Sequence, residues 1–294
     1  MEKVLRDRKA ILLFILPGLI LYTAFVTFPV LWSVYYSFYE GMPGFANWTF
    51  KGLGNYVKLF SDKNFTNAFS VNLRYMAIVM VGQVCIGLML SLMFIFWVKR
   101  AASLVRTIVF FPVVLPVVAV AQLFSKIYEI QPHYGLLNSL LAGIGLEGLV
   151  QPWLGQASTV LGALCGMDIW TALGFYAIIL YGALLDIPED IIEAARIDGC
   201  HSFQLFSRIL LPQLQPMLVT CFIFSFTGTI KMFESSLALT QGGPGGAARS
   251  LSMYMYDTAF TYQKTGYAST VALIILLLCL VGSAIIRRFD RKDL

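Results

Sequence analysis

Six long apolar segments dominate the sequence and restrict the folds that are open to it. A membrane-spanning helix needs about 20 mostly apolar residues. Six stretches of the 294-residue chain reach that length, namely 11–39, 68–98, 104–128, 159–185, 217–240 and 266–286. Hydrophobic residues make up 58% of the chain and charged residues only 13%, which excludes an ordinary soluble domain. The sequence therefore predicts an all-α membrane protein with six transmembrane helices.

Several residues interrupt these segments. Pro17 and Pro29 lie in the first segment, Pro112 and Pro116 in the third, and Asp168 in the fourth. Such breaks are tolerated in a membrane when neighbouring helices satisfy the freed backbone groups. The first segment is too long for the apolar region of a cleaved signal peptide and no small-residue cleavage pattern follows it, so we expect it to be a helix of the mature protein.

The positions of the basic residues predict the orientation, because short cytoplasmic loops are enriched in Lys and Arg. Most of the 21 basic residues fall on one side of the predicted bundle: Lys3, Arg6, Arg8, Lys9, Lys99, Arg100, Arg106, Arg196, Arg208, Arg287, Arg288, Arg291 and Lys292. The opposite loops hold three lysines in 40–67 and no basic residue in 131–158. Both termini are therefore expected in the cytoplasm. This bias also accounts for the net charge of +5, so no nucleic-acid partner is indicated.

A polar stretch separates the fourth and fifth segments. It contains EAARIDGCHSFQLFSRILLP, which starts at Glu193 and ends at Pro212. Upstream, Asp186 and Glu189 have the spacing of a capping box, and Gly199 suits a left-handed helix end. The stretch predicts a first short helix with Ile191, Ile192, Ala195 and Ile197 on its apolar face, and a second that begins near Ser202 and ends before Pro212. The residues leave two interpretations open: a knob for another protein's groove, or a loop resting on lipid headgroups.

The spacing within this stretch resembles a known family. Glu193-Ala194-Ala195, then Gly199, then Ile209-Leu210-Leu211-Pro212 resemble the EAA loop of binding-protein-dependent ABC importer permeases. A second match is LALTQGGPGGAARSLSMYMYDTAFTYQKTGYAST at 237–270, which is similar to the outer loop and last helix of sugar-type permeases, in particular the maltose-type first subunit.

The resemblance implies a type I ABC importer permease fold. Residues 1–66 would form an N-terminal addition, 67–288 the permease domain with its EAA loop at 186–212, and 289–294 a cytoplasmic tail. The helix near Glu193 would be the coupling helix, seated in a cleft of a cytoplasmic ATPase. Glu193 would contact polar or basic groups there, Ala194 and Ala195 would permit close approach, Gly199 would allow the sharp turn, and Ile209 and Pro212 would complete the motif.

The same resemblance implies partners and a function. The chain would be the permease subunit of an importer that translocates a carbohydrate, most simply an oligosaccharide, across a bacterial or archaeal cell membrane. It would work with a second permease, two cytoplasmic ATP-binding subunits and an extracellular solute-binding protein. The chain has no phosphate-binding loop and no Gly-Lys dipeptide, so it is not expected to be an enzyme, and ATP and Mg²⁺ would bind the ATPase. The five cysteines show no disulfide or metal-site spacing. The stretch QGGPGG at 241–246 is interpreted as a tight outer turn at the mouth of the pathway, with a plain connecting loop as the alternative.

Candidate residues for the substrate pathway combine aromatic faces with hydrogen-bonding groups. In the fifth segment they are Lys231, Phe233, Glu234 and Ser235, and in the fourth Trp170 and Tyr176, with Thr171 and Tyr181 as similar candidates. Packing or contact with lipid is the alternative role for the aromatic residues. Lys231 and Glu234 would lie one turn apart on a helix, so a mutual or interhelical ion pair is an equally open interpretation.

Other functions remain as alternatives. Within the same family the alternative solute is glycerol-3-phosphate or another polar compound. An ion-coupled secondary transporter would carry ionisable residues near mid-membrane. The candidates are Arg74, Lys126, Asp168, Lys231 and Glu234; most of them fall toward predicted helix ends, and the EAA loop would be unexplained. A membrane enzyme is disfavoured because the two histidines form no metal-binding or catalytic spacing.

Overall fold

The computed structural model describes residues 8–98 and 102–289. The predictions made for Lys3, Arg6, Lys99, Arg100, Arg291 and Lys292, and for the tail beyond residue 289, lie outside the described residues. The helices are α2 (Arg8–Tyr22), α3 (Phe28–Ser37), α4 (Gly54–Ser61), α5 (Lys63–Phe96), α6 (Ala102–Phe110), α7 (Val117–Ile127), α8 (Leu136–Gly143), α9 (Val160–Leu185), α10 (Glu189–Ile197), α11 (Ser202–Leu205), α12 (Leu211–Ile230), α13 (Glu234–Thr240), α14 (Leu251–Tyr256) and α15 (Thr265–Arg287). Two short strands, β1 (Tyr39–Glu40) and β2 (Thr49–Phe50), form an antiparallel pair.

The predicted all-α membrane class is confirmed. Five helices within the described residues are long and apolar enough to cross a membrane, and a bent pair makes a sixth if it is counted as one span. The first span is continuous over Leu12–Ser37, because a π-helical turn at Thr23–Thr27 joins α2 to α3. The predicted fourth and sixth segments agree with α9 and α15 to within one residue at each end.

The third predicted segment, 104–128, is not one straight helix. A bend of 102° separates the part that ends at Val114 from α7. Leu115 has an extended backbone, with φ −77° and ψ 141°, because a residue before proline is pushed out of the helical region. Pro116 then precedes the first turn of α7 with ψ 133°.

The fifth segment, predicted at 217–240, is wrong at both ends. One helix runs from Ser202 to Ile230, and a π-helical turn at Phe206–Leu210 leads into α12, so Pro212 does not end the preceding helix. The wider turn relaxes the clash that a proline ring makes with the carbonyl one turn earlier. At the other end the helix stops at Ile230, Phe233 is non-helical (φ −137°, ψ −57°), and α13 starts afresh.

Contacts divide the chain into two units. Of the described residues, the first comprises 8–62 and 255–276. Its hairpin and α4 are attached to the end of the first span, where the Asn55 side-chain nitrogen donates hydrogen bonds to the carbonyls of Ser37 (2.8 Å) and Tyr39 (2.7 Å). Glu40 forms salt bridges with Lys51 and Lys58, and the hydrogen bond from Lys51 is the main reason that the pKa of this carboxyl is lowered.

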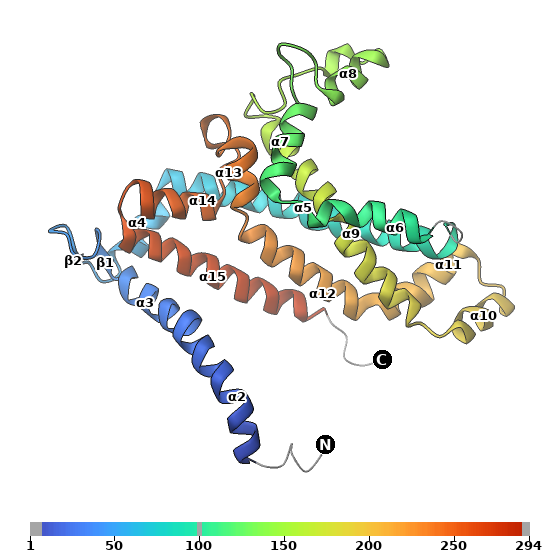
Figure 1. The fold of residues 1–294 in the computed structure, drawn as a ribbon, viewed down its shortest axis with the longest axis horizontal. Coiled ribbons are helices and arrows are strands. Elements are labelled where there is room, and N and C mark those ends of the chain that lie inside the picture. Colours follow the sequence, from blue (N-terminus) through green and yellow to red (C-terminus); the bar gives the residue numbers. More distant parts are fainter. Residues whose placement is uncertain (1–7, 99–101, 290–294) are drawn as a thin grey trace. The chain divides into compact units, whose positions relative to one another are not determined.

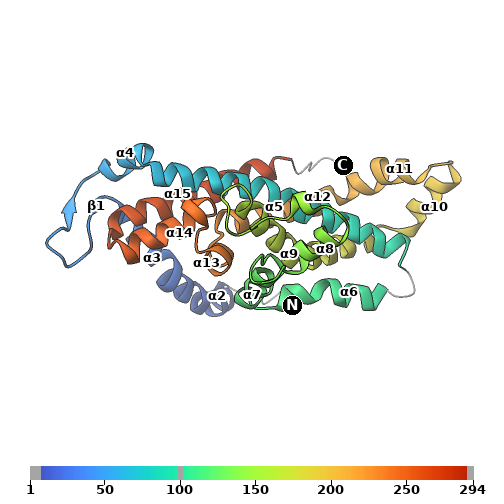
Figure 2. The ribbon, with the colours of Figure 1, turned by 90° about the horizontal axis from the view of Figure 1, so that it is seen from above.

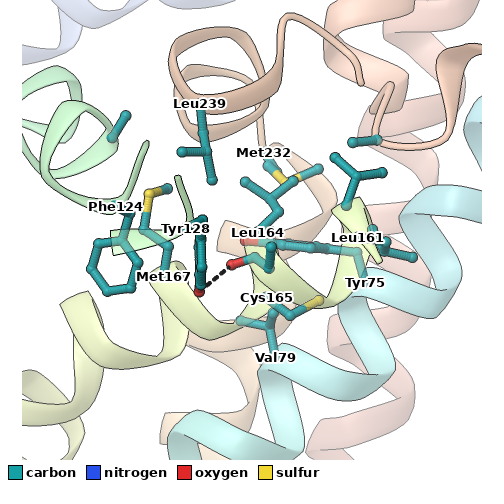
Figure 3. Close-up of a cluster of buried hydrophobic side chains, with 14 of the residues drawn as sticks. Tyr75, Val79, Phe124, Tyr128, Leu161, Leu164, Cys165, Met167, Met232 and Leu239 are labelled. Atoms are coloured by element: carbon teal, nitrogen blue, oxygen red, sulfur yellow. Dashed lines mark hydrogen bonds between the residues drawn. The ribbon is translucent and has the colours of Figure 1, made fainter. Parts of the chain in front are cut away.

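The second unit comprises the described residues 63–98, 102–254 and 277–289 and contains both candidate sites. In it α5 packs along α9 and α12 (Figures 1 and 2). Close approach is possible because Gly87 of α5 has no side chain: an added Cβ would lie 2.7 Å from the Cβ of Tyr176, and small residues let membrane helices approach closely. Figure 3 shows the main buried cluster, to which Tyr75 and Val79 of α5 and Leu164 and Met167 of α9 contribute.

Candidate functional site

The loop that follows α9 forms a compact helical turn at one end of the second unit (Figure 1). Asp186 ends α9, and Pro188 is the residue that precedes α10. The predicted capping box is wrong, because α10 has no side-chain cap. One face of α10 is held by an apolar cluster of the same chain: Ala195 is only 6% exposed and packs with Leu184, Ile187, Leu205, Leu210 and Leu214.

Gly199 closes α10 with a specific backbone motif. Its φ is +78°, the left-handed conformation that glycine adopts without steric cost. The Gly199 N–H donates to the Arg196 carbonyl (3.1 Å) and the Cys200 N–H to the Ala195 carbonyl (2.9 Å), which is the hydrogen-bond pattern of a Schellman motif. The left-handed turn predicted at Gly199 is confirmed, and it fixes the direction in which the chain leaves α10.

The exposed face of α10 differs from the predicted one. Glu193 and Ala194 are exposed, and Ile197, predicted on the same apolar face as Ala195, is 85% exposed whereas Ala195 is buried. Ala195 faces the chain's own cluster, so it is not accessible to a docking partner, whereas Ala194 is. The physical reason is the rotation of about 100° per residue along a helix, which places neighbouring alanines on different faces.

The second half of the loop is continuous with a membrane span. Ser202 is the first residue of α11, and His201, not Ser202, is its N-cap. The backbone N–H of His201 donates to Oε1 of Gln204 (3.1 Å). From Ser202 the helix continues to Ile230, with Ile209 packed against the same cluster as Ala195. The apolar cluster thus connects α10 directly to the start of the fifth span.

A polar cavity lies within the helix bundle. It has a volume of about 210 Å³ and is lined by Tyr75, Gln83, Asp168, Thr171, Ala172, Tyr176, Ser225, Gly228 and Thr229. The carboxylate of Asp168 accepts hydrogen bonds from the Tyr75 hydroxyl (2.6 Å) and the Ser235 hydroxyl (2.7 Å). The Gln83 amide nitrogen donates to the Asp168 backbone carbonyl (3.1 Å) and its amide oxygen accepts from Ser225 (2.8 Å).

The network joins α5, α9 and α12 to Ser235 of α13, which follows the helix break at Phe233. Buried polar groups within a membrane are costly unless they are paired, and they mark pathways or structural networks. The arrangement presents hydroxyl, amide and carboxylate groups to a small space, together with the ring of Tyr176. It is suited to hydrogen-bonding a polar solute.

The predicted pathway residues are distributed unevenly around this cavity. Tyr176 lines it, and Ser235 lies at its edge through Asp168. Trp170 instead packs on Phe124, with ring centroids 5.3 Å apart. Phe233 is half-buried at the helix break, and Lys231 and Glu234 are exposed. Among the residues described, no salt bridge involves Lys231 or Glu234, and they are not one turn apart on a single helix.

Sequence reasoning missed Tyr75, Gln83 and Ser225 and did not propose Asp168 for the pathway. A usable signal was present, because these are polar residues within apolar segments, where polar side chains face the bundle interior. What the sequence lacked was their convergence, since Tyr75 and Asp168 are 93 residues apart.

Several apolar spans with a polar cavity among them, and a helical turn at one end, are typical of a helical membrane transport protein. The chain belongs to the family described as "Binding-protein-dependent transport system inner membrane component", whose pattern matches residues 83–292. It is thus a permease subunit of an ABC importer.

Known relatives cover nearly the whole chain. It is 36% identical over 278 residues to a probable ABC transporter permease protein, YurN, of Bacillus subtilis, covering 94% of each chain. It is 31% identical to the trehalose/maltose transport system permease protein MalF of Thermococcus litoralis, covering 95% of this chain and 92% of that one. The predicted resemblance to sugar-type permeases is therefore confirmed.

A solved structure shows the same fold. A chain of a bacterial alginate ABC transporter, solved in complex with a periplasmic protein that carries an alginate pentasaccharide, superposes with a TM-score of 0.83 at 22% identity, covering 99% of this chain and 96% of that one. The predicted type I importer permease fold is confirmed.

Proposed function

We propose that this chain carries an oligosaccharide through the membrane as one half of a permease pair. Two cytoplasmic ATPases, which would bind ATP and Mg²⁺, drive transport, and an external binding protein delivers the solute. The observation that carries the proposal is the polar cavity between α5, α9 and α12, in a chain whose relatives include permeases named for trehalose and maltose and for lactose.

The chemistry of the cavity favours a neutral hydroxylated solute. Hydroxyl and amide groups of Gln83, Thr171 and Ser225 suit sugar hydroxyls, and the Tyr176 ring offers an apolar face. Among the described residues that line it none is basic, and Asp168 contributes a carboxyl group. A phosphate ester such as glycerol-3-phosphate would meet an acidic group without a compensating cation.

The cavity accommodates only part of an oligosaccharide. Sites for drug-sized ligands typically span about 300–1,000 Å³, and this one has about 210 Å³. The remaining contacts would come from the second permease, so that the solute passes between the two subunits. Tyr176 and Ser235 act on this side of the pathway, whereas Trp170 stabilises the bundle.

The exposed face of α10 is proposed as the site where an ATPase docks. Glu193 and Ala194 would contact the ATPase, Ala195 and Ile209 would hold α10 in place, and Gly199 would set its direction. Pro212 lies just after the widened turn that joins this loop to the fifth span. Closure of the ATPases on nucleotide would thereby move the span beside the cavity.

The orientation that accompanies this proposal places α10 and both termini in the cytoplasm and the glycine-rich turn at 241–246 outside. Gly245→Cys should react with a membrane-impermeant maleimide in intact cells, and the native Cys200 only after permeabilisation. The opposite labelling pattern would reverse the orientation.

The function is tested with the complete importer reconstituted in vesicles. Uptake of neutral di- and trisaccharides should require ATP on the side of the membrane that carries the ATPases and binding protein on the opposite side. It should persist when ion gradients are collapsed. Gln83→Met and Tyr176→Leu, which keep most of the side-chain volume, should lower uptake with little change in subunit abundance, and Trp97→Ala, at an 81% exposed position that does not line the cavity, provides a control. Uptake that follows an ion gradient without ATP, or that accepts only phosphate esters, would refute the proposal.

A further inference from the structure

The segment between α7 and α9 carries an exposed apolar surface that nothing described so far explains. Its residues are Tyr134, Leu136, Leu140, Ile144, Leu146 and Leu149, each between 45% and 69% exposed. Leu136, Leu140 and Ile144 recur every fourth residue and so follow one stripe of α8 and its end. Together these residues are called the α8 surface.

The α8 surface rests on a rigid base. Asn138, on the opposite side of α8, is completely buried. Its amide nitrogen donates to the carbonyls of Glu129 (3.1 Å) and Gln151 (3.2 Å), and its oxygen accepts from the Trp153 indole (2.8 Å) and the Gln151 N–H (3.4 Å). All the hydrogen-bonding capacity of the side chain is used, so α8 is held in one orientation with its apolar stripe outward.

Hydrogen bonds also hold the segment that contains α8 close to the start of the fourth span. The Thr159 hydroxyl, at the residue before α9, donates to the Trp153 carbonyl (2.8 Å), and Trp153 is bonded to Asn138. The Tyr128 hydroxyl donates to the carbonyl of Ala163 in the first turn of α9 (3.0 Å; Figure 3). Both ends of the segment are thus attached to the start of the fourth span, at the end of α9 opposite α10 (Figure 1).

The composition of the segment indicates that water does not cover it. Glu147 is the only charged residue between positions 130 and 158, and an exposed apolar patch of this kind marks a surface that contacts a membrane or another protein. The eight-residue α8 is too short to span a membrane. The surface also continues from α7, which carries exposed Val118 and Leu123 and packs against α8.

We propose that the α8 surface lies in the membrane interface of the leaflet opposite α10, with its apolar stripe among the acyl chains. In this position it is covered at every stage of the transport cycle. A binding protein that comes and goes would leave the stripe in water between encounters, and transient protein interfaces are no more apolar than the average surface. The contact anchors the start of α9, the helix that carries Asp168, at a defined depth.

The test uses the complete importer in lipid nanodiscs. Cys85, Cys200 and Cys279, the cysteines that are not buried, are replaced by serine. Leu140→Cys is labelled with an environment-sensitive fluorophore, and Glu147→Cys serves as the matched control on the same segment. Brominated lipids should quench the label at position 140 several-fold more strongly than the label at 147, and aqueous iodide should show the reverse order. Ile144→Cys should repeat the result for position 140.

Each other outcome identifies a different occupant and overturns the proposal. Equal quenching by iodide at 140 and 147 would place the stripe in water. Protection from both quenchers only after loaded binding protein is added would make it a docking surface for that protein. Constant protection from both would make it an interface with the second permease.

Discussion

Gly199 offers the sharpest test of the coupling loop, because its contribution can be separated from packing. A Cβ added there would meet no atom within 4 Å, so substitution creates no clash. The cost comes from the backbone alone: φ is +78°, and this conformation costs an L-residue about 1–2 kcal/mol. Such a cost shifts the equilibrium between the native turn and other conformations by a factor of about 5–30.

A graded series is expected from this argument. Gly199→Asn should be mildest, because asparagine tolerates the left-handed region; Gly199→Ala should be intermediate, and Gly199→Val most severe because of its branched Cβ. Gly182→Ala is the matched control: Gly182 lies in α9, its added Cβ also meets nothing within 4 Å, and its φ is not left-handed. Within a helix this replacement is neutral or stabilising.

The assay compares three quantities for each variant: abundance in the membrane, co-purification of the ATPase, and stimulation of ATP hydrolysis by solute-loaded binding protein. Abundance should stay near normal, because the turn lies outside the spans, while ATPase retention or stimulation falls in the order Asn, Ala, Val. If Gly199→Val behaves like Gly182→Ala, the direction of the chain after α10 is irrelevant to coupling and the argument fails.

Three further predictions concern neighbouring features. Ala195→Leu should overpack the buried cluster at a cost of about 1–3 kcal/mol and reduce membrane abundance, whereas Ala194→Leu should keep abundance and lose ATPase retention; equal abundance in both would contradict the assigned faces. Asp168→Asn preserves shape but changes the acceptor of two hydroxyl donors, so uptake should fall more than thermal stability of the purified complex; unchanged uptake would remove Asp168 from the pathway. Lys231→Glu and Glu234→Lys should have additive effects on uptake, since no ion pair joins them; rescue in the double variant would show coupling.

The positions of most spans and of one turn could be predicted from the sequence alone. Spanning helices need only length and apolarity, so five of the six segments were located to within a few residues, although the bend in the third was not resolved. The turn at Gly199 was also predictable, because a left-handed helix end depends on one residue and its nearest neighbours along the chain.

Helix ends that lie within apolar stretches were harder to predict from the sequence. Residues 231–240 are as apolar as the helix before them apart from Lys231 and Glu234, yet the helix stops at Ile230. The break places the Ser235 hydroxyl 2.7 Å from Asp168 of another helix. Hydropathy along one segment contains no information about a partner on a different helix.

The tertiary structure alone decided which residues form the cavity and which alanine is exposed. Asp168 meets Tyr75 and Ser235 across sequence separations of 93 and 67 residues, through the packing of α5 and α13 against α9. Ala194 and Ala195 are identical in chemistry, and only the cluster beneath α10 distinguishes them. Local pattern determines which segments span and where a turn forms, because those energies depend on nearby residues; the site depends on contacts between segments, which exist only once the helices have packed.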